Sequence, residues 1–323
     1  MDIQDILDIK IRGIPPGPHD AGLRAVKSHI DAAVRHFLRG QTEPDETLFT
    51  DVIFRCNQAF EGSIKEAYRV IAGKDPDHVR PFDIEKFFSE GNLLRQKVLD
   101  QFTRYRQEWR NPSAHDYTLD FDEDEALLAI VSVTTFAIVL CDQIDSRIAF
   151  DATAAATPAD TISIQQKNKP LLELVTERVL AFAKTHIDPN GNTGSPAHDY
   201  YRLEGALAGY LSSDLAQVPG LSVEQNKRFA SSEADIVVNR GIEKVVIELK
   251  RTSTKLSNRI VVLRAVTQVA LYLHEEDVAG AVILVHSPAV KEYEVSTPTG
   301  ALAELVRVVT PRLEAPASKA PSA

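Results

Sequence analysis

The chain has 323 residues, of which 44% are hydrophobic and 25% charged, and this composition excludes a mainly disordered or collagen-like protein. Its formal charge of −10 excludes a uniformly basic nucleic-acid coat protein. The two distant cysteines, Cys56 and Cys141, form no disulfide framework and suit a reducing cytosol. The acidic start MDIQDILDIK has no basic region before an apolar core, so we expect no signal peptide. These features predict a cytoplasmic protein of about two domains.

The first half of the chain, residues 1–150, predicts a helical bundle. Apolar residues recur there at spacings of three and four, which is the period of one helix face. A fourth helix begins near Asp122 with the acidic turn DEDE and continues into the apolar run 126–141. That run is too short and too polar to span a membrane, so we interpret it as a buried helix. The three periodic stripes are Leu23, Val26, Ile30, Val34 and Phe37; Phe49, Val52, Cys56, Phe60, Ile64, Ala67 and Ile71; and Leu94, Val98, Phe102, Tyr105 and Trp109.

The second half predicts an α/β domain after a linker. Residues 151–170 are small, polar and without period, which is typical of a linker. Residues 171–312 predict a mixed sheet with helices, and residues 313–323 a disordered tail. The predicted helices are 171–187, 199–215 and 259–274, and the predicted strands are 221–229, 235–238, 245–249 and 281–285. The predicted fold class is therefore a helical bundle followed by an α/β domain, and the net charge divides into −8 for residues 1–150 and −2 for residues 151–323.

The segment EWRNPSAHDY at the end of the third helix contains the first candidate site. Pro112 predicts that the helix stops next to Arg110, with His115 a short turn later. Histidine can move the proton of a ribose 2′-hydroxyl near neutral pH, and arginine can neutralise charge on a phosphorane-like transition state. Asn111 would bind phosphate or fix the histidine tautomer. The alternative is that Arg110 caps the helix C-terminus and His115 is a polar turn residue.

The motif RNPSAH, together with the helical pattern around it, resembles the HEPN superfamily. Its domains are bundles of four or five helices with an R-x4–6-H motif. The resemblance implies a homodimer that cleaves RNA without metal, with Arg110 and His115 catalytic and Asn111 auxiliary. Some HEPN domains are inactive and serve as dimerisation or ligand-binding modules, so this alternative stays open.

The segment SSEADIVVNRGIEKVVIELKR contains the second candidate site. A turn centred at Gly241 and Ile242 would pair Asp235 with Glu248 across two antiparallel strands. Lys250 would share a face with Glu248, because side chains two apart on a strand point the same way. Two close carboxylates attract Mg²⁺ or Mn²⁺, and a lysine beside them can activate water and stabilise phosphate charge. The alternative places Glu248 and Lys250 on the solvent face of a half-buried strand.

This motif and the order of the elements from about residue 171 to 285 resemble the PD-(D/E)xK nuclease superfamily, which has the restriction-endonuclease-like fold. The resemblance implies that Asp235 and Glu248 are metal ligands and that Lys250 is catalytic, with Ala234 standing in the proline position. Glu204, in YRLEGALAGYL, would be a further acidic ligand on the first core helix. A solvated helix glutamate is the alternative for Glu204.

The helix after the motif strand carries Gln268 and Tyr272, which are four residues apart and so lie on one helix face. The pair resembles the Q-x3-Y motif of RecB-like nucleases, which implies a catalytic Gln268 and an auxiliary Tyr272. The alternative for Tyr272 is a plain core residue.

Residues 240–264 hold seven basic side chains against two acidic ones, a net charge of +5 that predicts contact with a phosphate backbone. We therefore expect a Mg²⁺- or Mn²⁺-dependent nuclease, acting on DNA rather than RNA, whose HEPN-like half forms a homodimer and has no membrane role. Fusions of this kind suggest bacterial anti-phage defence. The alternatives are a HEPN ribonuclease toxin with the nuclease fold as a binding module, or a non-catalytic nucleic-acid sensor. The predicted nucleic-acid contacts are Arg251, Lys255, Arg259 and Arg264.

Overall fold

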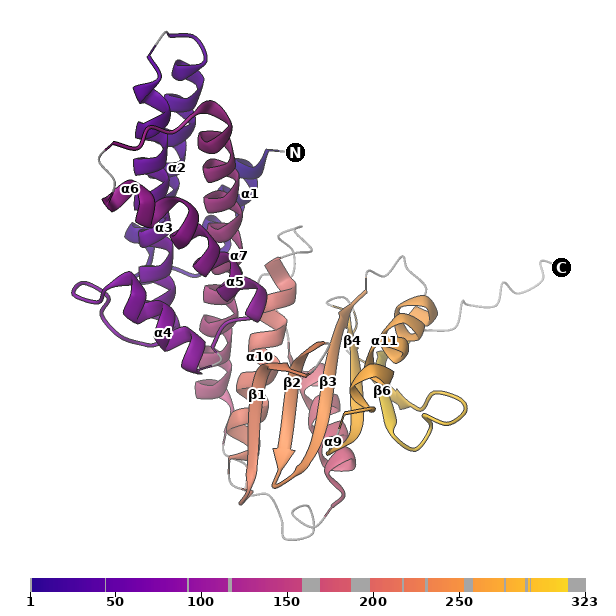
Figure 1. The fold of residues 1–323 in the computed structure, drawn as a ribbon. Helices are drawn as coiled ribbons and strands as arrows, with labels where there is room; N and C mark the ends of the chain where they lie inside the picture. Colours follow the sequence, from indigo (N-terminus) through magenta and orange to yellow (C-terminus); the bar gives the residue numbers. More distant parts are fainter. Residues whose placement is uncertain are drawn as a thin grey trace, which may run out of the picture. The chain divides into compact units, whose positions relative to one another are not determined.

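The computed structural model divides the chain into two compact units, Met1–Ala149 and Phe150–Ala323. The first is helical, and the second combines helices with one sheet (Figure 1). The predicted tail, Lys255, most of the predicted linker and the side chain of His115 lie outside the described residues. The residues described are 2–43, 45–91, 93–115, 118–158, 169–186, 198–216, 218–229, 232–252, 258–275, 277–287, 290 and 292–312.

The helices of the first unit pack their apolar faces into one core. Every residue of the three predicted stripes is buried except Val34, which is partly buried, so the spacing predicted these helices correctly. Two further helices, α1 and α4, were not predicted. The elements of this unit are α1 (Ile3–Gly13), α2 (Asp20–Gly40), α3 (Thr47–Ile71), α4 (Pro81–Gly91), α5 (Gln96–Tyr105), the π-helical turn η1 (Arg106–Arg110), α6 (Asn111–His115) and the start of α7 (Glu123–Ala156).

Helix α7 begins where the acidic turn predicted and ends later than predicted. The Glu125 N–H donates to Asp122 Oδ1 at 2.9 Å, and the Asp122 N–H donates to Glu125 Oε2 at 3.2 Å, which together form a capping box. The helix continues to Ala156, so the predicted start of the linker at Asp151 is wrong. The cause is the alanine-rich sequence ATAAA, because alanine has the highest helix propensity.

Among the described helices, α7 is the one long and apolar enough to cross a membrane by length and composition. Of its most apolar window, 61% is buried against the rest of the protein, which matches the prediction of a buried core helix.

A buried ion pair joins the first and last helices of this unit. The Lys10 ammonium on α1 binds Asp142 Oδ1 on α7, and the two residues are 5% and 7% exposed. Burial raises the pKa of Asp142 in spite of this partner. Burying a charge away from water costs free energy, and in this pair each buried charge is compensated by the other.

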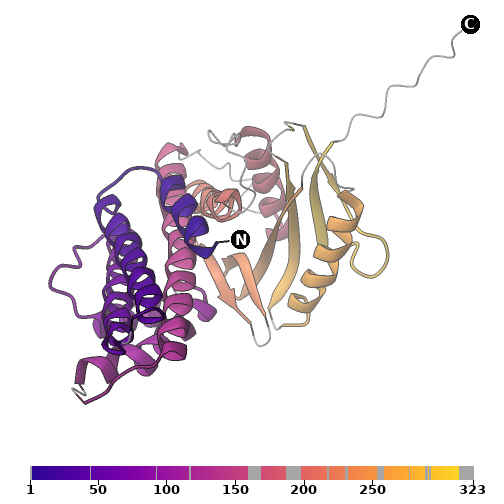
Figure 2. The same cartoon turned by 90° about the horizontal axis from the view of Figure 1, so that it is seen from above.

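The second unit is a six-stranded mixed sheet with helices on both faces. The strand order is β1-β2-β3-β4-β6-β5, in which β4 runs parallel to both β3 and β6 and the other neighbours are antiparallel. Helices α9 and α10 cover one face and α11 the other (Figures 1 and 2). The elements are α9 (Leu171–Thr185), α10 (His198–Leu215), β1 (Leu221–Arg228), β2 (Glu233–Arg240), β3 (Glu243–Arg251), α11 (Asn258–Tyr272), β4 (Val278–His286), β5 (Tyr293–Ser296) and β6 (Val306–Pro311).

The hairpin of β2 and β3 has the predicted register. Its ladder runs from Arg240 opposite Glu243 to Ile236 opposite Ile247. Gly241 has a φ of +63°, the left-handed conformation that glycine supplies in a two-residue hairpin turn. A single glycine therefore fixes how the two strands that carry the second candidate motif are aligned.

Candidate functional site

Two acidic side chains lie together where β2 begins and β3 approaches its end. Asp235 is 7% exposed and Glu248 is 1% exposed, and the paired ladder ends one residue short of them. Asp235 Oδ2 accepts a hydrogen bond from the Leu249 N–H at 2.9 Å, which holds it against β3. The burial of Glu248 is inconsistent with the alternative that placed it on a solvent face.

Lys250 provides the positive charge beside this pair. Its ammonium donates to Glu248 Oε1, so the two side chains share a face of β3 as predicted. The Lys250 side chain is 26% exposed, whereas that of Glu248 is 2% exposed. Lys250 therefore connects the buried carboxylates to the protein surface.

Glu248 is held in an environment that disfavours its ionised form. Burial and, after it, the negative charge of Asp235 raise the pKa of Glu248, Lys250 and Tyr272 act in the opposite direction, and the resulting pKa is about 7. A group with such a pKa exchanges its proton near neutral pH, which is a common property of functional carboxylates.

Helix α11 carries the predicted pair Gln268 and Tyr272, and Tyr272 lies next to Glu248. Gln268 Nε2 donates to the Tyr272 hydroxyl at 3.1 Å, so the two residues do lie on one helix face. The Tyr272 ring is fully buried in the apolar core under α11. Its hydroxyl lies 3.0 Å from the Glu233 carbonyl oxygen and 3.4 Å from Glu248 Oε2. Tyr272 is thus both a core residue and a neighbour of the site.

Tyr200 on α10 belongs to the same cluster, and the sequence analysis missed it. Its hydroxyl donates to Asp235 Oδ2 at 2.9 Å. Burial raises the pKa of Tyr200, and the charges of Asp235, Glu204 and Glu248 add to this effect. Glu204, one turn later, is 1% exposed, which excludes the solvated alternative for it. The four-residue spacing of Tyr200 and Glu204 on one helix face was the available signal.

The donor set suits a small, hard cation. Among the described residues, no three histidine, cysteine or acidic side chains converge into a metal cage, so Glu204 does not form a three-residue group with Asp235 and Glu248 there. Mg²⁺ commonly binds through one or two carboxylates and completes its shell with water and substrate phosphate. Burial and the like charge of Asp235 both raise the pKa of Glu248, and a cation bound between the two carboxylates would stabilise their charges.

The described basic residues of the predicted patch over residues 240–264 do not form one surface. Arg240 and Lys244 lie at the turn end of the hairpin, with Arg240 about 16 Å from Asp235 along β2, and they bind Glu243 and Asp277. Arg251 ends β3 beside Lys250, and Arg259 and Arg264 are exposed on α11. The charge near the carboxylates is therefore smaller than the sequence count of +5.

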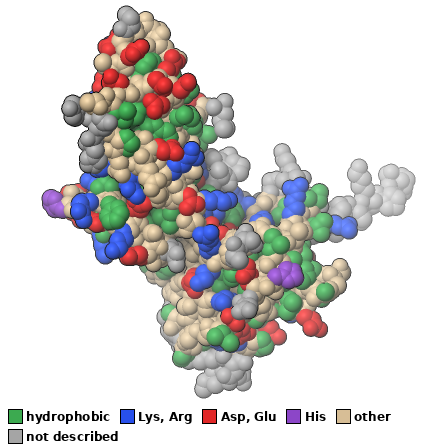
Figure 3. Space-filling model, in the orientation of Figure 1, with side chains coloured by type: hydrophobic (Ala, Val, Ile, Leu, Met, Phe, Trp, Pro, Cys, Tyr) green, Lys and Arg blue, Asp and Glu red, His purple; other side chains and the backbone are tan. Residues whose placement is uncertain are grey.

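Acidic side chains lie around one end of the bundle, which Figure 3 shows as the upper tip. A groove of about 940 Å³ lies there. The negative charge at this end of the bundle disfavours contact with a phosphate backbone, because like charges repel. The residues lining the groove are Gly40, Gln41, Glu43, Asp45, Glu46, Thr47, Phe49, Asp120, Phe121, Asp122 and Glu123.

The helix that carries Arg110 does not stop there, contrary to the prediction. It passes through the π-helical turn η1 and continues as α6, with Pro112 in second position. The Asn111 N–H donates to the Arg106 carbonyl oxygen five residues back, which is the pattern of a π-turn. This wider turn accommodates a proline, which has no N–H and whose ring collides with the normal ladder. Arg110 and the backbone of His115 therefore lie on one continuous helical segment.

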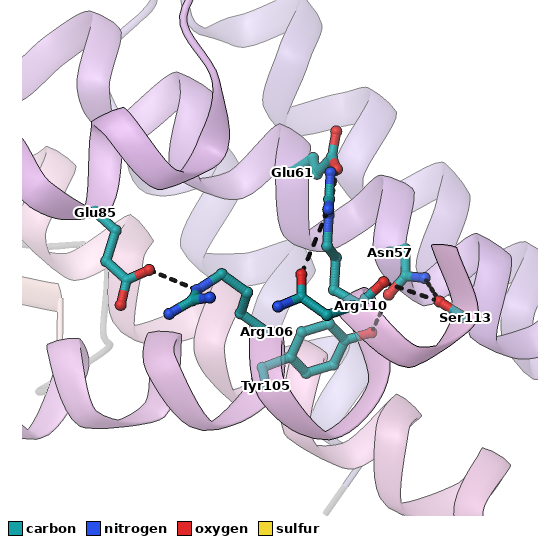
Figure 4. Close-up of polar contacts among 8 residues, drawn as sticks. Asn57, Glu61, Glu85, Tyr105, Arg106, Arg110 and Ser113 are labelled. Atoms are coloured by element: carbon teal, nitrogen blue, oxygen red, sulfur yellow. Dashed lines mark hydrogen bonds and ion pairs between the residues drawn. The ribbon is translucent and has the colours of Figure 1, made fainter. Parts of the chain in front are cut away.

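Arg110 lines a pocket together with residues of α3, and Figure 4 shows its contact with Glu61 of that helix. Its Nε donates to Glu61 Oε1 at 3.2 Å, and its Nη1 lies 3.4 Å from Asn111 Oδ1. Beneath it, Asn57 Nδ2 donates to Ser113 Oγ at 2.7 Å, and Ser113 Oγ donates to the Arg110 carbonyl oxygen at 3.2 Å. These bonds fix the turn that presents the guanidinium.

The neighbouring arginines are paired in the same way. Arg106 Nε donates to Glu85 at 2.7 Å (Figure 4), and Arg104 Nε donates to Glu108 at 3.0 Å. Each of these carboxylates offsets the positive charge of its arginine. Glu61 does the same for Arg110, so a phosphate would have to compete with Glu61 for the guanidinium.

The raised pKa of Glu248 predicts a stability that depends on pH. Folding favours the protonated acid, so its contribution is full below the usual pKa near 4.5 and is lost as pH rises to about 7. Glu248→Gln imitates the protonated form and should gain stability over the unmodified protein as pH rises, by up to about 1.4 kcal/mol per pH unit. The ratio of amide-exchange protection in β3 between the two proteins, measured in EDTA from pH 5 to 7.5, checks this.

Glu243→Gln is the matched control, because Glu243 lies on the same strand and pairs with Arg240 near the turn. It measures the effect of losing a carboxylate on β3 away from Asp235. A ratio for Glu248→Gln that does not change with pH would contradict the raised pKa of Glu248.

Comparison with known proteins identifies no relative: no family model, curated protein or solved structure matches the chain.

Proposed function

We propose that this chain is a metal-dependent nuclease that hydrolyses phosphodiester bonds, with DNA as the expected substrate. The observation that supports this most is the placement of Asp235 and Glu248 side by side on paired strands, with Lys250 bonded to Glu248. The mixed sheet with helices on both faces is compatible with the restriction-endonuclease-like fold that the sequence motif resembles.

In the proposed reaction, Asp235 and Glu248 would hold Mg²⁺ or Mn²⁺. Such a cation polarises the phosphate and makes a bound water more acidic. Lys250 is the accessible cation of the site, so it would contact the scissile phosphate and stabilise charge that develops on it. Tyr272 would position the Glu248 carboxylate, and Gln268 would position the Tyr272 hydroxyl. Glu204 adds negative charge near Tyr200. Arg251, Arg259 and Arg264 would contact the flanking backbone.

The helical unit would then act as a HEPN-like dimerisation module in a bacterial anti-phage protein. A second candidate function is metal-independent cleavage of RNA by Arg110 and His115, with Asn111 beside them. It is favoured by the π-helical turn at Arg106–Arg110, because such turns inside α-helices are frequently found at functional sites.

Cleavage assays on single- and double-stranded DNA and RNA, each with Mg²⁺, Mn²⁺ or EDTA, test both functions. We expect cleavage of DNA with metal and none in EDTA, and its loss in Asp235→Asn. This substitution keeps an oxygen that can accept the bonds from Leu249 and Tyr200, so the fold should survive.

Asp277→Asn, at the exposed turn end of the sheet, is the control and should cleave normally. Metal-dependent cleavage that persists in Asp235→Asn would refute the assigned site. RNA cleavage that persists in EDTA and disappears in Arg110→Ala would instead support the second candidate.

A further inference from the structure

Tyr200 approaches the acidic pair from the face of the sheet opposite α11. It lies in the first turn of α10, which packs on β1 and β2. Its hydroxyl and the Leu249 N–H both donate to the same atom, Asp235 Oδ2, and both distances are 2.9 Å. Two donors from different elements fix the position and the plane of this carboxylate.

The Tyr200 hydroxyl is the donor in this contact, and a carboxylate oxygen is the acceptor. Hydrogen bonds to a charged acceptor are shorter and stronger than those between neutral groups, so this contact orients the carboxylate well.

Two protein donors hold one oxygen of Asp235. Oδ2 accepts hydrogen bonds from the Tyr200 hydroxyl and the Leu249 N–H, so the carboxylate that would bind a cation is held in one orientation. Glu248 has a comparable neighbour in Tyr272 from α11. The two carboxylates are thus each approached by a tyrosine from a different face of the sheet.

We infer that Tyr200 is a positioning residue of the proposed metal site, where its hydrogen bond to Oδ2 holds the Asp235 carboxylate in the orientation that would bind a divalent cation. The inference rests on the proposed function. Groups that hydrogen-bond to a metal ligand orient it, and losing one typically lowers metal affinity about 10- to 100-fold. Tyr200 would therefore act on metal affinity first and on the chemical step only through it.

Titration of the full chain with Mn²⁺, followed by calorimetry and by the paramagnetic resonance of free Mn²⁺, tests this without any substrate. We expect Tyr200→Phe to weaken Mn²⁺ binding about 10-fold or more. With DNA, the Mn²⁺ concentration for half-maximal cleavage should rise by the same factor, while the rate at saturating Mn²⁺ changes by less. A residue with a merely structural role would lower the melting temperature and leave this metal dependence in place.

Tyr293→Phe is the matched control. Its hydroxyl is also buried in the second unit, but it bonds the Ser287 backbone, so its loss measures the cost of removing a buried phenol hydroxyl elsewhere. Unchanged Mn²⁺ affinity in a folded Tyr200→Phe would overturn the role of Tyr200 and leave the proposed function standing. If the unmodified protein binds no Mn²⁺, the proposed function itself fails, and this inference with it.

Discussion

Lys250→Ala should lose metal-dependent cleavage by about 100- to 1,000-fold, the usual effect of removing one group that stabilises transition-state charge. The same variant should bind Mn²⁺ no more weakly than the unmodified protein. Both expectations have one cause: the ammonium bonded to Glu248 Oε1 offsets part of the negative charge of the carboxylate pair when metal is absent. Removing the ammonium leaves the site more negative and therefore more attractive to a cation, but without the group that meets the phosphate.

Single-turnover cleavage at saturating Mn²⁺, combined with Mn²⁺ calorimetry, separates the two effects. Lys244→Ala is the matched control, because Lys244 lies on the same strand and binds Asp277 near the turn. It should change neither quantity. Full cleavage by Lys250→Ala would remove this residue from the mechanism, and a parallel loss of Mn²⁺ affinity would mean that Lys250 supports the metal site instead of the chemistry.

Lys10→Met should lower the free energy of unfolding of the helical unit by about 3–5 kcal/mol at pH 8, because it leaves the Asp142 charge buried without its partner. The loss should shrink as pH falls, since burial raises the pKa of Asp142 and protonation removes the unpaired charge. Urea unfolding followed by tryptophan fluorescence measures this unit alone. Trp109 is the single tryptophan of the chain and is buried in the first unit.

The double variant Lys10→Met with Asp142→Leu is the control for this experiment. Replacing a buried ion pair by apolar residues of similar size is often neutral or stabilising, so the double variant should recover most of the lost stability. A single variant that unfolds at the same urea concentration as the unmodified protein would show that the pair contributes little.

Local patterns predicted the parts of the fold that depend on local physics. The stripes of apolar residues identified helices whose buried faces match residue by residue. One glycine turn gave the alignment of β2 and β3, because a strand register is fixed once its hairpin turn is fixed. The hairpin register therefore predicted from the sequence alone that Asp235 lies opposite Glu248.

The remaining features depend on packing between distant segments. Pro112 was expected to end its helix, since a proline disrupts the ladder, but a π-helical turn absorbs it. Strand β6 pairs only with the distant β4 and with β5, so it carried no hairpin signal of its own. Tyr200 joins the site through a contact spanning 35 residues; its spacing from Glu204 indicated a shared helix face but not the contact with Asp235.

The acidic groove at the tip of the bundle also affects how the proposed substrate would approach. Basic residues alone would make the encounter with DNA fastest in dilute buffer. At low ionic strength, however, the repulsion from this groove and from the net −8 of the helical half reaches well beyond the surface, and salt shortens its range to about 10 Å at 0.1 M. Attraction and repulsion then weaken together as salt is added, so association rates should vary less with ionic strength than the arginines alone would suggest.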